Sequence, residues 1–233
     1  MRRIDKTIQR ATLYEQKLRE FDETGKDHPN YTQSPFRTAY YNDVFMSLLC
    51  CQGGVCAYTE SLICNVSNIT TSVCWENGKY EAPVSVSPIE ARNLEGNIEH
   101  FDSDLKKTHG WQWDNLFVVC SAINSKVKGK KKVDYILKPD VPGYDPFQLL
   151  TYDFDTHFFT PNPDLDDATA KKVREMIDTL GINFRTIVDR REERLESYRV
   201  DIHSGLKTYE SLRSQLREFF TAFDMSREEL EAA

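Results

Sequence analysis

Asn97-Ile98-Glu99-His100-Phe101 is the stretch that decides the fold, together with Trp113-Asp114-Asn115-Leu116 and Cys120-Ser121-Ala122-Ile123-Asn124-Ser125-Lys126. The first stretch predicts a short strand. Successive side chains of a strand point to opposite faces, so Glu99 and His100 would need a bend or a bulge to serve one site. The apolar residues 116–119 predict a second strand or the start of a buried helix, and residues 124–132 predict a helix entry or an exposed basic loop. This order is compatible with two strands followed by a helix.

The side chains in these stretches suit the hydrolysis of a phosphodiester bond. That reaction needs a general base near neutral pH, and often a divalent cation that neutralises charge on the leaving oxygen. His100 can be the base, and Asn115 can orient it through a hydrogen bond. Glu99 and Asn124 offer the oxygen ligands that Mg²⁺ and Mn²⁺ prefer. Each residue taken singly is more often structural, but the ordered spacing, fifteen residues from His100 to Asn115 and nine more to Asn124, raises the joint probability of a site.

Lysines follow and interrupt the motif. Five occur in the seven residues from 126 to 132, and two more follow the first stretch. A run of like charges is usually a solvated face, but beside an acid, a histidine and two asparagines it is about as readily explained by phosphate contacts. The candidate nucleic-acid-binding residues are Lys106, Lys107, Lys126, Lys128, Lys130, Lys131 and Lys132.

Composition limits the class of protein to which the chain can belong. The chain has 233 residues, 39% of them hydrophobic and 29% charged, which is typical of a soluble globular protein. We find no apolar run of the ~18 to 20 residues that span a bilayer and no signal-peptide core, so we expect a cytoplasmic protein without membrane contact. The net charge of −7 argues against a chain that coats nucleic acid along its whole surface, although a local basic site is compatible with it.

Helices are expected at both ends of the chain. Apolar spacing predicts helices at residues 4–21 and 37–51 and three charged amphipathic helices at 168–180, 183–198 and 209–223. Residues 61–90 form a long polar insertion in which Asn77-Gly78 predicts a two-residue hairpin turn. A second hairpin is predicted around Asp155.

The quoted stretches, with Cys56-Ala57-Tyr58-Thr59-Glu60, resemble the HNH endonucleases associated with retrons and with Septu-type antiphage systems. The resemblance covers about residues 50–163. It implies an α+β fold, mainly helical around a ββα-metal (HNH) finger, with helical N-terminal and C-terminal segments. The expected division is an N-terminal helical segment at 1–52, a nuclease core at 53–163 with the insertion 61–90, and a C-terminal helical segment at 164–233.

The resemblance also implies roles. His100 is the expected base, Asn115 the orienting residue, and Glu99 and Asn124 the ligands of a catalytic Mg²⁺ or Mn²⁺. The expected substrate is nucleic acid, with DNA favoured over RNA, and the expected activity is that of an antiviral effector controlled by a partner ATPase of the ABC or SMC-like kind. The alternative is a catalytically inactive HNH-like subunit that acts as a protein-interaction or regulatory module. The C-terminal helices can dock on the ATPase, on a second copy of the chain, or simply on their own core.

One part of the family pattern is missing. Members typically carry two Cys-x-x-Cys pairs that hold a structural zinc, and here Thr59 and Ile123 replace the second cysteine of each pair. The residual zinc-type positions, Cys56 and Cys120, do not make the four ligands of a structural site. Either zinc is lost and packing around Ile123 holds the finger, or Cys64 and Cys74 replace the missing ligands. Loss is favoured because those spacings are long and irregular.

Overall fold

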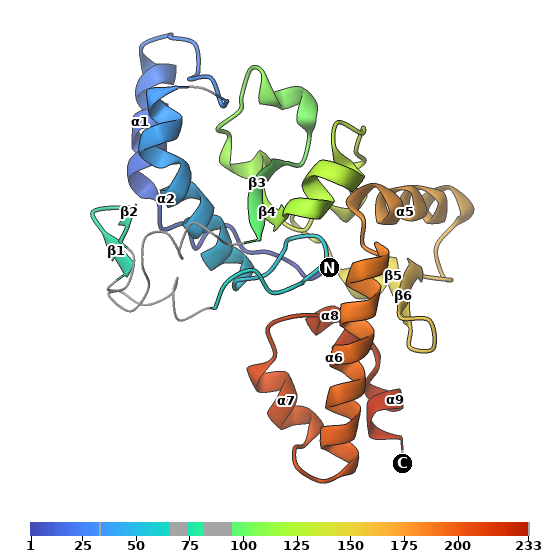
Figure 1. The fold of residues 1–233 in the computed structure, drawn as a ribbon. Helices are drawn as coiled ribbons and strands as arrows, with labels where there is room; N and C mark the ends of the chain where they lie inside the picture. Colours follow the sequence, from blue (N-terminus) through green and yellow to red (C-terminus); the bar gives the residue numbers. More distant parts are fainter. Residues whose placement is uncertain (33, 66–73, 82–94, 233) are drawn as a thin grey trace. The chain divides into compact units, whose positions relative to one another are not determined.

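The computed structural model describes residues 1–32, 34–65, 74–81 and 95–232 (Figure 1). The described residues form helices and three antiparallel sheets of two strands each, so the predicted α+β class is confirmed. The chain divides into two compact units. We call residues 4–57 and 62–132 the motif unit, and residues 1–3, 58–61 and 133–233 the C-terminal unit.

This division differs from the expected one at 1–52, 53–163 and 164–233. The N-terminal helices belong to the same unit as the quoted stretches, and the boundary lies at residue 132 instead of 163. One physical reason is visible in the motif unit. The Gln52 side chain at the end of the second helix donates to the carbonyl oxygen of Val118 at 2.8 Å and accepts from its N–H at 2.8 Å, and so it ties the helix to the later strand.

Two helices open the motif unit, α1 (Thr12–Glu23) and α2 (Pro35–Gln52). The first begins eight residues later than predicted. The second begins where the Ser34 hydroxyl accepts from the Arg37 N–H at 3.1 Å, and it ends at Gly53, whose φ of 66° is the left-handed conformation that glycine adopts freely. Its ends therefore follow from ordinary capping residues.

The insertion is described only in part, because residues 66–73 and 82–94 lie outside the described residues. Within it, β1 (Trp75–Glu76) pairs with β2 (Lys79–Tyr80), and the turn residues Asn77 and Gly78 have φ of 50° and 75°. The predicted hairpin turn is confirmed.

The central hairpin consists of β3 (Gly96–His100) and β4 (Leu116–Cys120), which pair antiparallel from Gly96 opposite Cys120 to His100 opposite Leu116. The strand predicted for the first stretch is confirmed, and of the two alternatives for residues 116–119 the structure shows the strand. Two short 3₁₀-helices, η3 (Ser103–Lys106) and η4 (Trp113–Asn115), lie in the connection. A π-helix, η5 (Ile123–Lys128), follows the second strand. The ββα-metal finger itself stays a prediction.

The C-terminal unit contains a second hairpin and the remaining helices. The hairpin pairs β5 (Leu150–Asp153) with β6 (Phe158–Pro161), as predicted. The helical elements are η6 (Tyr135–Leu137), α4 (Pro146–Leu149), α5 (Asp167–Leu180), α6 (Arg185–His203), α7 (Tyr209–Gln215), α8 (Phe220–Met225) and α9 (Arg227–Glu231). The single helix predicted at 209–223 is wrong: the chain leaves the helix after Gln215, and Phe219 adopts a left-handed φ of 52° before the next helix begins.

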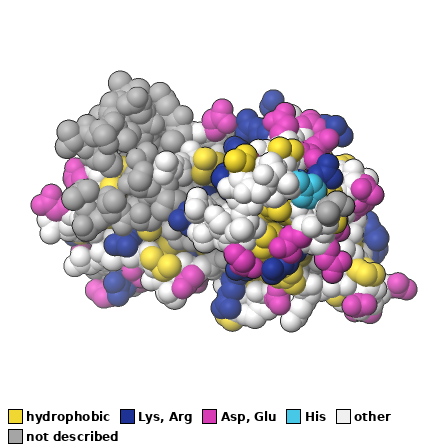
Figure 2. Space-filling model, turned by 90° about the horizontal axis from the view of Figure 1, so that it is seen from below, with side chains coloured by type: hydrophobic (Ala, Val, Ile, Leu, Met, Phe, Trp, Pro, Cys, Tyr) yellow, Lys and Arg dark blue, Asp and Glu magenta, His cyan; other side chains and the backbone are white. Residues whose placement is uncertain are grey.

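The surface carries mixed charge. On the face drawn in Figure 2, acidic and basic side chains lie intermixed and do not gather into one basic field. None of the helices in the described parts of the chain is long and apolar enough to cross a bilayer.

Candidate active site

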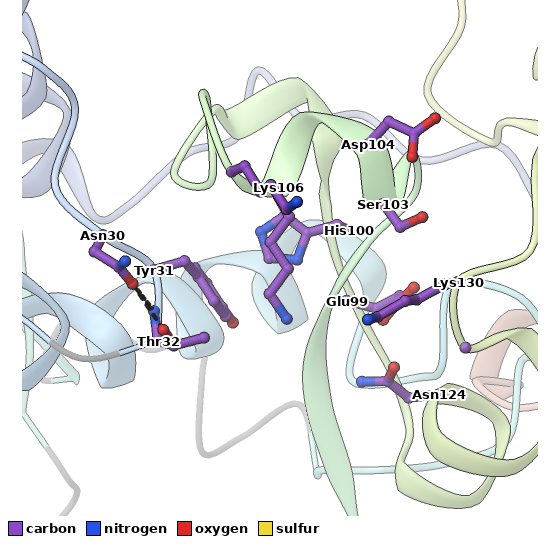
Figure 3. A pocket seen from close by; sticks show the side chains of 12 residues that line it. Asn30, Tyr31, Thr32, Glu99, His100, Ser103, Asp104, Lys106, Asn124 and Lys130 are labelled. Atoms are coloured by element: carbon purple, nitrogen blue, oxygen red, sulfur yellow. Dashed lines mark hydrogen bonds between the residues drawn. The ribbon is translucent and has the colours of Figure 1, made fainter.

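The predicted base and the two predicted metal ligands meet at a pocket of about 800 Å³ in the motif unit, which Asn115 does not line (Figure 3). Its walls come from the loop before α2, the end of β3, the connection after it and the region of η5. The described lining residues are Asn30, Tyr31, Thr32, Glu99, His100, Ser103, Asp104, Lys106, Lys107, Asn124, Gly129 and Lys130. The structure therefore brings together the predicted base, the two predicted metal ligands and three of the seven predicted lysines.

His100 is the last residue of β3, which explains how it shares the pocket with its neighbour Glu99. The register of β3 against β4 is regular, so no bulge is needed; the chain leaves the strand directly after the histidine. The imidazole is 3% exposed, and the Tyr31 ring packs edge-on against it with 4.4 Å between ring centroids. Packing thus fixes the ring at the edge of the pocket.

A backbone carbonyl selects the tautomer of His100. Its Nε2 lies 2.8 Å from the Gly110 oxygen, and a carbonyl oxygen only accepts, so Nε2 carries the proton and donates. Nδ1 is then the basic nitrogen, and no other described residue hydrogen-bonds to it. Burial lowers the pKa of His100 to about 4; the charges of Lys106 and Lys128 add to this shift, and the bond to Gly110 opposes it. The histidine is neutral at pH 7 and able to take a proton.

The expected bond from Asn115 to His100 is replaced by a different arrangement. The Asn115 side chain accepts from the Asp102 N–H at 2.8 Å and donates to the Asp102 carbonyl oxygen at 2.9 Å. In addition, the Phe101 N–H donates to the Asn115 backbone oxygen at 2.8 Å. Asn115 therefore holds the two residues after His100, and it positions the histidine through the backbone. The direct partner of the ring is Gly110.

Sequence reasoning missed Gly110, which contributes only a backbone oxygen. A Cβ atom at this position would lie 2.7 Å from the Lys106 carbonyl oxygen and 2.9 Å from Tyr31 Cβ, closer than such atoms approach in proteins. Only glycine lets the chain pass between Lys106 and Tyr31 with its carbonyl on the histidine. The available signal was a glycine directly after His109, in the connection between two strands.

Lys128 was expected to contact nucleic acid, and this expectation is wrong. Its side chain is fully buried, and its Nζ lies 2.5 Å from Glu99 Oε1 and 2.9 Å from the His100 carbonyl oxygen. Burial raises the pKa of Glu99, while the charge and hydrogen bond of Lys128 act in the opposite direction. The lysine is thus a structural cation at the floor of the site.

This ion pair bears on the expected divalent cation. Figure 3 shows the Asn124 side chain on the same side of the pocket as Glu99, so two protein oxygens are available. However, Glu99 Oε1 is already in an ion pair with the Lys128 ammonium. Within the described ranges, no group of three or more His, Cys, Asp or Glu side chains is placed to hold a metal ion. The donor set in this arrangement does not fit a divalent ion held by the protein.

The remaining lysines fall into two groups. Lys106, Lys107 and Lys130 are exposed and line the pocket. Lys126, Lys131 and Lys132 are exposed but do not line it, and for these the interpretation as a solvated face is sufficient.

The two residual zinc-type positions lie next to each other. The Cys120 N–H donates to Cys56 Sγ at 3.4 Å, and Cys56 is 1% exposed. Ile123, the residue expected to pack in place of a zinc ligand, is fully buried. Cys64 and Cys74 are buried as well. Loss of the structural zinc stays a prediction, and the burial of Ile123 provides the packing that it requires.

Comparison with models of known protein families and with curated protein sequences found no match for this chain.

Proposed function

We propose that the chain is a nuclease that hydrolyses phosphodiester bonds in nucleic acid, with DNA favoured as the substrate. The observation that carries the proposal is the His100 ring, neutral, fixed in one tautomer by Gly110, and located on a pocket with three exposed lysines. A neutral imidazole with a defined lone pair is the usual general base near pH 7.

In the proposed reaction, Nδ1 of His100 takes a proton from water as the water oxygen attacks phosphorus. The bond from phosphorus to the leaving ribose or deoxyribose oxygen breaks, and that oxygen gains a proton from solvent. Lys106, Lys107 and Lys130 attract the phosphates of the strand and offset the negative charge that grows on the reacting group. Asn115 contributes by fixing the backbone that follows His100.

Dependence on Mg²⁺ or Mn²⁺ is a separate part of the proposal. An ion bound by Glu99 and Asn124 would compete with the Lys128 ammonium, which is hydrogen-bonded to Glu99 Oε1.

We also propose, from the resemblance to nucleases of retrons and Septu-type systems, that the chain is an antiviral effector controlled by an ABC or SMC-like ATPase. The helices of the C-terminal unit are the proposed contact, either with that ATPase or with a second copy of the chain. Copurification with the ATPase encoded beside it would test this part.

The second candidate is an inactive HNH-like subunit that regulates or recruits another protein. The observation that favours it is the Lys128–Glu99 pair, because an ammonium lies where the family places a catalytic cation. A chain of this kind would bind its partner and cleave nothing.

The test of the nuclease proposal uses the full chain, plasmid DNA and single-stranded DNA and RNA, each with Mg²⁺, Mn²⁺ or EDTA. His100→Ala should lower the cleavage rate by roughly 10² to 10⁴, the usual contribution of a general base. His109→Ala is the matched control, because His109 is an exposed histidine in the same connection and does not line the pocket. Equal cleavage by the parent and His100→Ala would show that His100 is not the base, and no cleavage by the parent under any condition would favour the inactive subunit.

A further inference from the structure

A second pocket, of about 950 Å³, lies at the other end of β3 from the first pocket. Gly96 and Asn97 line it from the start of the strand, whereas Glu99 and His100 line the first pocket at its end. Thr32 lines both. Asn97 and His100 are three residues apart, or about 10 Å at ~3.3 Å per residue, which is the length of about three stacked nucleotides at ~3.4 Å each. A strand held at His100 therefore reaches the second pocket.

The wall of the second pocket is a column of side chains on one face of α2. Arg37, Tyr41 and Phe45 are four residues apart, so they lie above one another on successive turns. The Arg37 guanidinium lies 4.1 Å from the centroid of the Tyr41 ring, which stacks on Phe45 at 6.2 Å and an interplanar angle of 21°. The Ile98 N–H donates to the Tyr41 hydroxyl at 3.4 Å and so joins the column to β3. The column is therefore fixed relative to the first pocket.

Charge in this pocket suits a polyanion. Arg37 is its cation, and none of the described residues that line it is acidic, although the whole chain has a net charge of −7. Asn97 and Thr38 are exposed and add an amide and a hydroxyl group to the lining; Asn97 Nδ2 donates to Ser121 Oγ at 2.8 Å, and its carbonyl oxygen accepts. Aromatic and guanidinium planes with nearby amides are the groups that bind the faces and edges of unpaired bases.

We infer that this second pocket binds an unpaired nucleotide of the strand whose phosphate lies at His100. This inference deepens the proposed nuclease function and rests on it. A base in a duplex is stacked and cannot enter a concave pocket without leaving the stack, so the substrate class is single-stranded or locally unpaired nucleic acid. The Arg37 guanidinium, stacked on Tyr41, faces the nucleotide, and the lysines of the first pocket hold its neighbouring phosphates.

The test measures binding without cleavage. His100→Ala protein in EDTA is titrated into a fluorescently labelled 20-nucleotide DNA strand, and separately into the same strand in a duplex, with anisotropy as the signal. We expect the single strand to bind at least about tenfold more tightly. In this background, Thr38→Trp fills the pocket from an exposed position on α2, and Arg37→Met removes its cation. Each should weaken single-strand binding by roughly 5- to 100-fold, the range for loss of one base stack, and leave duplex binding nearly unchanged.

Arg19→Met, an exposed arginine on α1 outside both pockets, is the control of equal charge. Circular dichroism checks that every variant is folded, and having two different variants guards against failure of one to fold. Single-strand binding that neither variant weakens would overturn the nucleotide pocket while leaving the nuclease proposal standing. Absence of any nucleic-acid binding by the His100→Ala chain would overturn both.

Discussion

The central hairpin and the hairpin of the C-terminal unit have the same parts and different surroundings. Each is a two-stranded antiparallel sheet with a buried histidine, His100 at 3% and His157 at 5% exposure. Each histidine has one ring nitrogen in a hydrogen bond, to the Gly110 carbonyl at 2.8 Å and to the Tyr152 hydroxyl at 2.7 Å. A fully buried cation contacts each hairpin, Lys128 of η5 at Glu99 and Arg191 of α6 at His157.

The difference lies in what these groups face. Arg191 donates to the carbonyl oxygens of His157 and Ile182, both at 2.7 Å, and its guanidinium packs 4.8 Å from the Phe159 ring centroid. His157 lines neither of the two pockets. His100 instead borders a pocket with exposed lysines. A buried histidine with a lowered pKa is therefore not enough to indicate catalysis. What distinguishes His100 from His157 is the pocket that His100 borders and the exposed lysines that line this pocket.

The largest effect should come from breaking the buried ion pair. Lys128→Met leaves the Glu99 carboxylate buried without its partner, so the free energy of unfolding should fall by ~3 to 5 kcal/mol near pH 8. Arg191→Met leaves only neutral carbonyl groups unpaired and should cost ~1 to 3 kcal/mol. Urea denaturation measures both. All three tryptophans, Trp75, Trp111 and Trp113, belong to the motif unit, so their fluorescence follows the first variant, and circular dichroism follows the second.

Two controls make this prediction specific. Glu99→Gln combined with Lys128→Met removes both charges and should recover most of the loss. The pKa of Glu99 is already raised by burial and should rise further without Lys128, so the Lys128→Met deficit should shrink as pH falls and Glu99 takes a proton. A deficit that is independent of pH and no larger than that of Arg191→Met would contradict the buried pair.

The pH dependence of the two histidines should separate their roles. The pKa of His100 is lowered from 6.5 to about 4, so its contribution to stability is present above pH 6.5 and is lost as pH falls through 4. This contribution to the free energy of unfolding totals ~3 kcal/mol. His100→Gln should remove the corresponding dependence of stability on pH. The cleavage rate should likewise fall as pH drops below about 4, because the base must be unprotonated to act. A cleavage rate that already falls near pH 6.5 would show that His100 is not the residue that limits the rate.

A smaller effect is expected for His157. Burial lowers its pKa too, but we expect His157→Ala to leave cleavage per folded molecule unchanged. Stability should fall by ~1 to 3 kcal/mol, because the variant loses the Tyr152 bond and places alanine at a φ of 56°. His157→Asn should lose less, since asparagine tolerates that conformation. Thermal unfolding together with cleavage assays checks this, and lost cleavage in folded His157→Ala protein would end the distinction between the two hairpins.

The smallest effect concerns the two groups of lysines. In the His100→Ala background, the triple variant Lys106→Gln, Lys107→Gln and Lys130→Gln should reduce the salt dependence of single-strand binding, by up to ~0.7 for each phosphate that a lysine no longer neutralises. The triple variant Lys126→Gln, Lys131→Gln and Lys132→Gln makes the same change of net charge away from the pocket and should reduce it less. An equal salt dependence of single-strand binding in the two triple variants would show that the lysines act only through the overall charge.

The sequence predicted the local structure where the signal was local. The hairpin around Asp155 and the Asn77-Gly78 turn follow from turn residues that are adjacent in the chain, whereas periodicity alone did not predict the pairing of β3 with β4. The role of Lys128 could not be predicted, because it lies in a run of exposed lysines and its partner is 29 residues away. Gly110 acts through a backbone oxygen, which leaves no side-chain signal. The break at Phe219 also escaped, since the apolar spacing continues through it.

The π-helix that carries Lys128 makes the direction of this lysine depend on the type of helical turn as well as on the number of residues after Asn124. A π-helix has a wider turn than an α-helix, and it is commonly a single-turn bulge within one. Deleting one residue between Asn124 and Lys128 would favour an ordinary α-turn, in which each residue rotates the chain further, by ~100°. Three residues of the α-turn would then bring the lysine to nearly the direction that four residues of the π-turn give it. Sequence comparisons that require fixed spacing after Asn124 would therefore align the wrong lysine with this position.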